Sequence, residues 1–85
     1  MKRPTPLVVD AITRILAPHL GPFMAKAAVE GHRKKLGLAE TLLSESDVET
    51  LLKKVERGLV IFVGAEKTAT LVDEARRAAR GIPKS

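Results

Sequence analysis

The chain is 85 residues long and carries a formal net charge of +5, so it forms one domain close to the lower size at which a single hydrophobic core is sufficient. It contains no Cys, which excludes disulfides, thiol catalysis and Cys-ligated metal sites and fits a reducing compartment. It also lacks Asn and Gln, while Lys, Arg and Glu are abundant, a composition that avoids thermolabile residues and indicates a thermophilic source.

The N-terminal segment does not have the pattern of a targeting sequence. Lys2 and Arg3 are followed by an apolar run, but Asp10 and Arg14 interrupt that run. The segment is therefore neither a signal peptide nor a membrane span. We expect a cytoplasmic protein without a membrane partner, and the small core favours oligomerisation.

A first helix is predicted to follow a loose N-terminal arm at residues 1–4. Thr5 followed by Pro6 is typical of an N-cap with proline at the first helical position. Pro18 predicts that this helix kinks or ends nearby, because proline removes a helical hydrogen bond. Apolar residues recur at helical spacing and define one buried face, consisting of Val8, Ala11, Ile12, Ile15 and Leu16.

A second helix is predicted for residues 22–36, after a turn at Gly21 and before a stop at Gly37. Small residues let another backbone approach closely, so we expect this helix to pack against a neighbour. The segment 38–43 would then connect it to the next helix and cover the core. The small residues of the second helix are Ala25, Ala27, Ala28 and Gly31.

A third helix is predicted to begin at a capping box formed by Ser46 and Glu49, which stand three residues apart before an apolar run. The segment 59–63 is apolar on every side and has two interpretations. Its Val, Ile and Phe residues between two glycines are also typical of a buried strand. No second convincing strand is present to pair with it, so we prefer a helix and leave the strand as an alternative.

A fourth helix is predicted for residues 65–80, followed by a stop at Gly81 and a loose tail at residues 82–85. One face of this helix is apolar and predicts a buried side. That face carries Ala69, Val72, Ala75 and Ala79.

The order helix, glycine, helix occurs twice along the chain. A shift of 43 residues places Gly21 on Gly64, with tight turns predicted at Leu20-Gly21-Pro22 and Val63-Gly64-Ala65. The predicted fold is a single all-α domain, residues 1–85, in which four helices form two pseudo-repeated helical hairpins.

No catalytic or cofactor site can be assembled from the sequence. Residues 59–68 resemble the strand, loop and helix of a phosphate-binding loop, but Glu66 precedes Lys67 where that motif needs glycine. His19 and His32 are the only histidines, and they do not have the spacing of a metal site. We predict that the protein is not an enzyme and has no catalytic residue, no metal and no cofactor.

Basic residues cluster at the ends of the predicted second and fourth helices. Acidic residues three or four positions earlier are expected to pair with several of them on an exposed helix face. Alternatively, the two clusters form one basic surface that follows nucleic-acid phosphates. Tyr and Trp are absent, so such binding would be directed to the backbone and independent of sequence. The clustered residues are Arg33, Lys34, Lys35, Arg76, Arg77 and Arg80.

Two short motifs surround the predicted turns. The first contains Leu16, Leu20, Gly21, Pro22 and Ala25, and the second contains Val63, Gly64, Glu66, Lys67 and, displaced by one position, Ala69. Together they resemble a small helical module of unassigned function found at the ends of bacterial and archaeal regulatory proteins. The resemblance implies an all-helical accessory domain used for association, and it transfers no catalytic residue.

The predicted function is protein association, with a homodimer as the first expectation. The alternative is a sequence-nonspecific nucleic-acid-binding domain that uses the basic clusters. Under the first hypothesis, the alanine-rich faces of the second and fourth helices assist an apolar contact segment. That segment consists of Leu59, Val60, Ile61, Phe62 and Val63.

Overall fold

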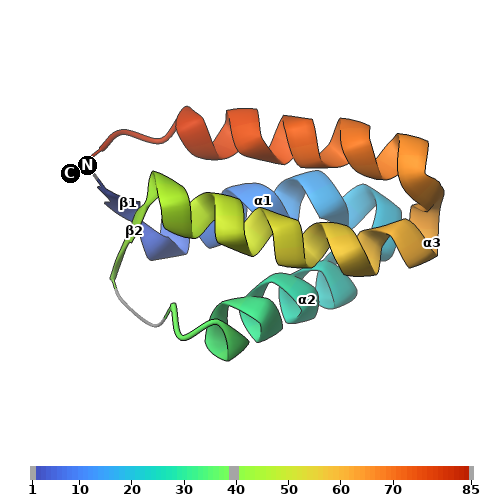
Figure 1. Cartoon of the computed structure of the whole chain (residues 1–85), viewed down its shortest axis with the longest axis horizontal. Coiled ribbons are helices and arrows are strands. Elements are labelled where there is room, and N and C mark those ends of the chain that lie inside the picture. The colour runs from blue at the N-terminus through green and yellow to red at the C-terminus, as the bar shows by residue number, and fades with distance from the viewer. Residues whose placement is uncertain (1, 39–40, 85) are drawn as a thin grey trace.

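The computed structural model describes residues 2–38 and 41–84. The predicted four-helix, all-α domain is wrong, because the described chain forms three helices and a two-stranded antiparallel sheet. Figure 1 shows the sheet and both chain ends at one end of the molecule, from which the helices extend. In chain order the elements are strand β1 (Lys2–Pro4), helix α1 (Thr5–Leu20), helix α2 (Pro22–Lys35), strand β2 (Leu42–Ser44) and helix α3 (Glu45–Arg80).

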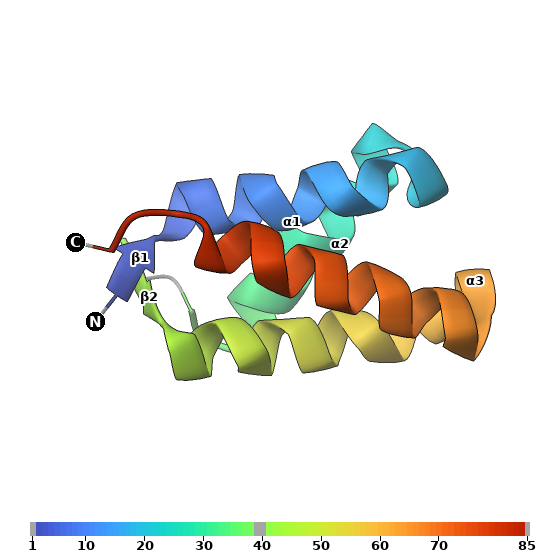
Figure 2. The ribbon, with the colours of Figure 1, turned by 90° about the horizontal axis from the view of Figure 1, so that it is seen from above.

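Helix α3 contains both segments that were predicted as separate third and fourth helices. Gly64 interrupts it with φ 83° and ψ 167°, a non-helical conformation. No loop follows this glycine, so residues 45–63 and 65–80 form one sharply bent element. The chain nevertheless reverses direction there, and the second half of α3 runs back along the molecule (Figures 1 and 2).

Strand β1 replaces the loose arm that was predicted for residues 1–4, of which residue 1 lies outside the described part. It pairs with β2 in antiparallel register, with Arg3 opposite Leu43. The Arg3 side chain is buried and donates from Nε to the Ile82 carbonyl at 2.9 Å and from Nη2 to the Arg80 carbonyl at 3.2 Å. Ile82 also packs against the core. The predicted loose tail is therefore held at its first residue, and residue 85 lies outside the described part.

The helix boundaries differ from the predicted ones for local reasons. Thr5 is the first residue of α1 rather than its N-cap, which is Pro4. The helix then continues through Pro18 to its last residue, Leu20. Helix α2 ends at Lys35, one residue before the predicted end, and Gly37 follows with a positive φ of 72°.

The start of α3 is a capping box, located two residues earlier than predicted. The Asp47 N–H donates to Ser44 Oγ at 3.0 Å, and the Ser44 N–H donates to Asp47 Oδ2 at 3.0 Å. These reciprocal bonds satisfy two backbone donors that have no partner inside the helix. The predicted pair, Ser46 and Glu49, therefore lies within α3 instead of capping it.

The core is formed by the inner faces of all three helices and by Leu43 of β2. Leu43 is fully buried, so the end of the predicted connector does cover the core, although residues 39–40 lie outside the described part. Figures 1 and 2 show α2 and residues 65–80 on opposite sides, with α1 and residues 45–63 between them. Fully buried members of the core include Val8, Ile12, Ala25, Val29, Leu51 and Ala79.

Candidate protein-interaction surface

Five large apolar side chains remain exposed beside the two glycine turns. Two of them follow Gly21 at the start of α2, and three precede Gly64 in α3. Both turns lie at the end of the molecule farthest from the sheet (Figure 1). We call this set the turn-end patch, and it consists of Phe23 (82% exposed), Met24 (49%), Val60 (41%), Ile61 (84%) and Phe62 (65%).

The apolar segment 59–63 is helical, so the strand alternative is wrong. Successive helical residues point in different directions, and an apolar run therefore cannot be buried on all sides by one neighbouring layer. Leu59 is 2% exposed, and Val63 packs against the core. The segment thus offers Val60, Ile61 and Phe62 to a partner, while Leu59 and Val63 stabilise the fold.

The alanine-rich helix faces belong largely to the core. Ala25, Ala75 and Ala79 are buried, whereas Ala27, Gly31 and Ala69 are exposed. Small residues that face solvent contribute little apolar area. These faces therefore do not form a continuous contact surface of their own.

An apolar groove of about 150 Å³ lies between α2 and the first half of α3. Two small residues line the groove, Ala28 on α2 and Gly58 on α3. A Cβ built on Gly58 would meet no atom within 4 Å. The groove is therefore hollow because its small residues leave space that no side chain of residues 2–38 and 41–84 fills. Its lining consists of Leu20, Ala28, His32, Val55, Gly58, Leu59 and Phe62.

One part of this groove lies among positive charges. Burial lowers the pKa of His32 below its ordinary value of 6.5, and the ammonium groups of Lys35 and Lys54 lower it further. Within residues 2–38 and 41–84, neither lysine forms an ion pair with a carboxylate. The groove thus has a mainly apolar lining, and two lysines without a carboxylate partner among the described residues act on His32 at one part of it.

The predicted basic clusters contain arginines that already have partners. Arg33 donates to both carboxylate oxygens of Glu30, at 3.2 and 3.0 Å, and to the Leu38 carbonyl at 2.9 Å. Its pairing lowers the pKa of Glu30. These bonds tie the end of α2 to the following turn, so Arg33 has a structural role.

The cluster at the end of α3 has the same character. Arg76 donates to both oxygens of Glu49, at 2.7 and 2.9 Å, and joins the two halves of α3. This fork-shaped pair lowers the pKa of Glu49. Arg77 pairs with Asp73, which leaves Arg80 as the exposed member of the cluster without a carboxylate partner among the described residues.

The two basic clusters do not meet within one chain. Lys34 and Lys35 are exposed at the end of α2, and Arg80 is exposed at the end of α3. These helix ends lie on opposite sides of the molecule (Figure 1). A continuous phosphate-binding surface would therefore need a second molecule to bring the clusters together.

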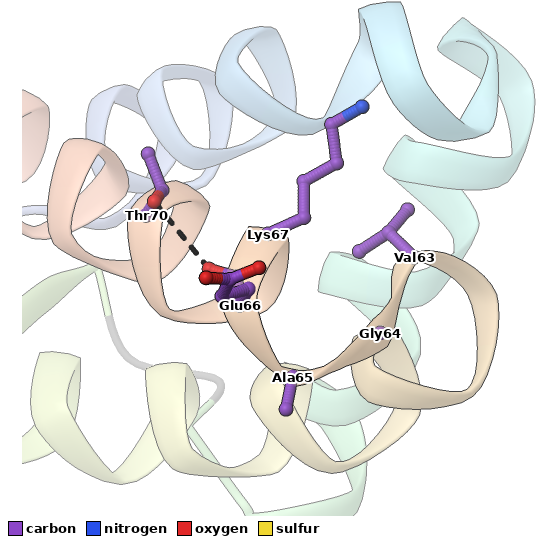
Figure 3. A pocket seen from close by; sticks show the side chains of 6 residues that line it. All are labelled: Val63, Gly64, Ala65, Glu66, Lys67 and Thr70. Atoms are coloured by element: carbon purple, nitrogen blue, oxygen red, sulfur yellow. Dashed lines mark hydrogen bonds between the residues drawn. The ribbon is translucent and has the colours of Figure 1, made fainter.

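The hollow around Gly64 does not have the chemistry of a phosphate-binding loop. Figure 3 shows the side chains that line this hollow, among them the Glu66 carboxylate and Lys67. The Thr70 hydroxyl donates to the Glu66 carbonyl at 3.4 Å, and the Thr68 hydroxyl donates to the Gly64 carbonyl at 2.6 Å. Both threonines therefore satisfy the backbone of α3, and the carboxylate would repel an anion.

The described ranges contain no cluster of metal-binding side chains. No group of three or more His, Asp or Glu side chains there is placed to hold a metal ion. His19 is exposed in the last turn of α1, whereas His32 lines the groove. Across residues 2–38 and 41–84, every helix is too short or too polar to cross a bilayer.

Sequence reasoning missed three residues at the surface and the sheet. Phe23 and Met24 are exposed in the turn-end patch, and their signal was an apolar pair directly after a glycine-proline turn, outside the buried periodic face. Arg3 had no detectable signal, because its partners lie at the opposite end of the chain.

Comparisons of the chain with protein-family models, with curated proteins and with solved structures give no match.

Proposed function

We propose that this chain is a non-enzymatic association domain that forms a homodimer through the turn-end patch. The observation that carries the proposal is the concentration of exposed Phe, Ile, Met and Val side chains at one end of the molecule. Single exposed apolar residues are normal on protein surfaces, but a group of them marks an interaction site. Burying one such side chain contributes about 1.5–3 kcal/mol.

The charge distribution supports contact between two copies at this end. The basic ends of α2 and α3 lie toward the sheet, at the opposite end of each molecule (Figure 1). A dimer with the patches in contact therefore holds the basic helix ends of the two copies far apart. In a two-fold dimer the same patch serves both copies, so one set of apolar residues is sufficient.

The nucleic-acid alternative has less support. Arg33, Arg76 and Arg77 are paired with carboxylates of their own chain, and phosphate binding would have to compete with those pairs. Lys34, Lys35 and Arg80, which have no carboxylate partner among the described residues, lie at helix ends on two sides of the molecule. Association through apolar contacts needs no ion pair to be broken and no joining of the two basic clusters.

Sedimentation equilibrium of the wild type and of Ile61→Glu tests the proposal. Ile61 is 84% exposed, so a carboxylate there does not disturb the core, but it would be buried without a partner in the dimer. We expect the wild type to be dimeric at tens of micromolar (about −6 to −7 kcal/mol). We expect Ile61→Glu to be a folded monomer with an unchanged circular dichroism spectrum.

Leu7→Glu is the matched control. Leu7 is 52% exposed in the first turn of α1, close to the sheet and away from the turns. This variant adds the same charge but should remain dimeric. A monomeric wild type at tens of micromolar, or a dimeric Ile61→Glu, would refute the proposed function.

A further inference from the structure

The groove between α2 and α3 is a second surface with a different chemistry from the turn-end patch. Ala28 and His32 stand one helical turn apart along α2, and the lining residues of α3 extend over seven positions, from Val55 through Gly58 to Phe62. Seven residues of a helix extend about 10 Å. The groove therefore has the length of two helical turns, enough for two or three side chains of a bound helix.

Gly58 is not used to bring α3 close to α2. A glycine at a close helix crossing would have a neighbouring atom near its missing Cβ, but Gly58 has none within 4 Å. A glycine inside a helix also costs about 1 kcal/mol relative to alanine. The open space above Gly58 instead accommodates apolar side chains from outside the chain.

The charges at the groove select the partner. Lys35 and Lys54 lie near His32 and have no carboxylate partner among the described residues. A partner with carboxylates at this position would gain charge-assisted hydrogen bonds from both lysines. A second copy of this chain is poorly suited, since a two-fold contact through this groove would bring the same lysines of the two copies together.

We propose that this groove binds an acidic amphipathic helix of another protein. Its apolar side chains lie over Ala28 and Gly58, between Leu20 and Phe62, and its carboxylates face Lys35 and Lys54. This is the helix-in-groove form of peptide recognition, in which side chains one helical turn apart serve as anchors. The site is distinct from the turn-end patch, although Phe62 belongs to both surfaces.

Fluorescence anisotropy with two designed helical peptides tests this proposal. Both peptides carry leucines at positions i, i+4 and i+7, and the flanking positions are Glu in one peptide and Lys in the other. We expect the acidic peptide to bind the wild type with a Kd on the order of 10–100 μM and the basic peptide to bind at least about tenfold more weakly. Equal affinity for the two peptides, or no binding of the acidic one, would overturn the proposal.

Three variants locate the binding. Gly58→Leu fills the groove and should weaken acidic-peptide binding by about tenfold or more. Ala69→Leu is its control, because it adds a leucine at an exposed position in the half of α3 that lies opposite α2, and it should bind like the wild type. The double variant Lys35→Glu/Lys54→Glu should reverse the preference and bind the basic peptide more tightly.

Separate measurements distinguish this site from the proposed dimer. Ile61 does not line the groove, so the monomeric Ile61→Glu should bind the acidic peptide at least as tightly as the wild type does, because no second copy covers its Phe62. Gly58→Leu should remain dimeric. If Gly58→Leu binds the peptide normally, or loses self-association instead, the groove is not a site for an acidic partner and the inference fails.

Discussion

Gly21 and Gly64 adopt nearly the same backbone conformation, with φ and ψ of 87° and 148° at the first and 83° and 167° at the second. This region is accessible almost exclusively to glycine. At both positions a helical segment of the chain ends and another begins directly. Both reversals lie at the end of the molecule farthest from the sheet, and the apolar residues beside them share that end.

Substituting Gly64 by Ala should destabilise the fold. A Cβ at this position meets no atom within 4 Å, so the cost comes from the positive φ and not from a clash. We expect a loss of about 1–3 kcal/mol in the free energy of unfolding, measured by urea denaturation. Gly31→Ala is the control, because Gly31 is a helical glycine with open surroundings, and its replacement should stabilise the protein by up to about 1 kcal/mol. Equal stability of the two variants would contradict the described turn.

Replacing Arg3 by Met should loosen the contact between the two ends of the chain. The guanidinium binds the carbonyls of Arg80 and Ile82, and Met keeps the apolar stem while removing these donors. We expect the free energy of unfolding to fall by about 1–3 kcal/mol, whereas Lys2→Met in the exposed neighbouring position should have little effect. Faster amide exchange near residue 82 in the Arg3 variant would show that the C-terminal end is the part that loosens. Equal unfolding free energies of the two variants would contradict a stabilising role of the Arg3 hydrogen bonds.

The Glu49–Arg76 pair should make stability depend on pH in the acidic range. The pKa of Glu49 lies below its ordinary value of 4.5, mainly because Arg76 donates hydrogen bonds to it. The ionised carboxylate therefore contributes its full stabilisation at pH values above 4.5, the ordinary pKa. This contribution is lost as the pH falls through the lowered pKa of the folded state.

Glu49→Gln isolates this contribution from those of Glu30 and Glu45, whose pKa values are also lowered by arginine partners. Urea denaturation should give a wild-type advantage of roughly 1 kcal/mol above about pH 5.5, falling toward zero near about pH 3. An advantage that does not change over this range would show that the pair is not electrostatic in origin.

Several local features could be predicted from the sequence because they depend on near neighbours. Helical periodicity located the core face of α1, and the positive φ values at Gly21 and Gly37 occur where glycine was expected to end a helix. The capping box was displaced by two residues, since Ser44 and Asp47 satisfy its chemistry as well as the predicted pair does. The sequence pattern alone could not choose between these two possible N-terminal capping boxes for α3.

The sequence by itself determined that most of the chain is helical, that it reverses at Gly21 and Gly64, and that apolar residues are in excess near Gly64. The tertiary structure decided that residues 2–4 pair with residues 42–44, that Leu59 is buried while Ile61 is exposed, and that Arg76 binds Glu49. The difference has one physical cause. Helix formation and glycine turns follow from interactions over a few residues, whereas strand pairing, side-chain exposure and ion pairs across 27 residues depend on how the elements pack together.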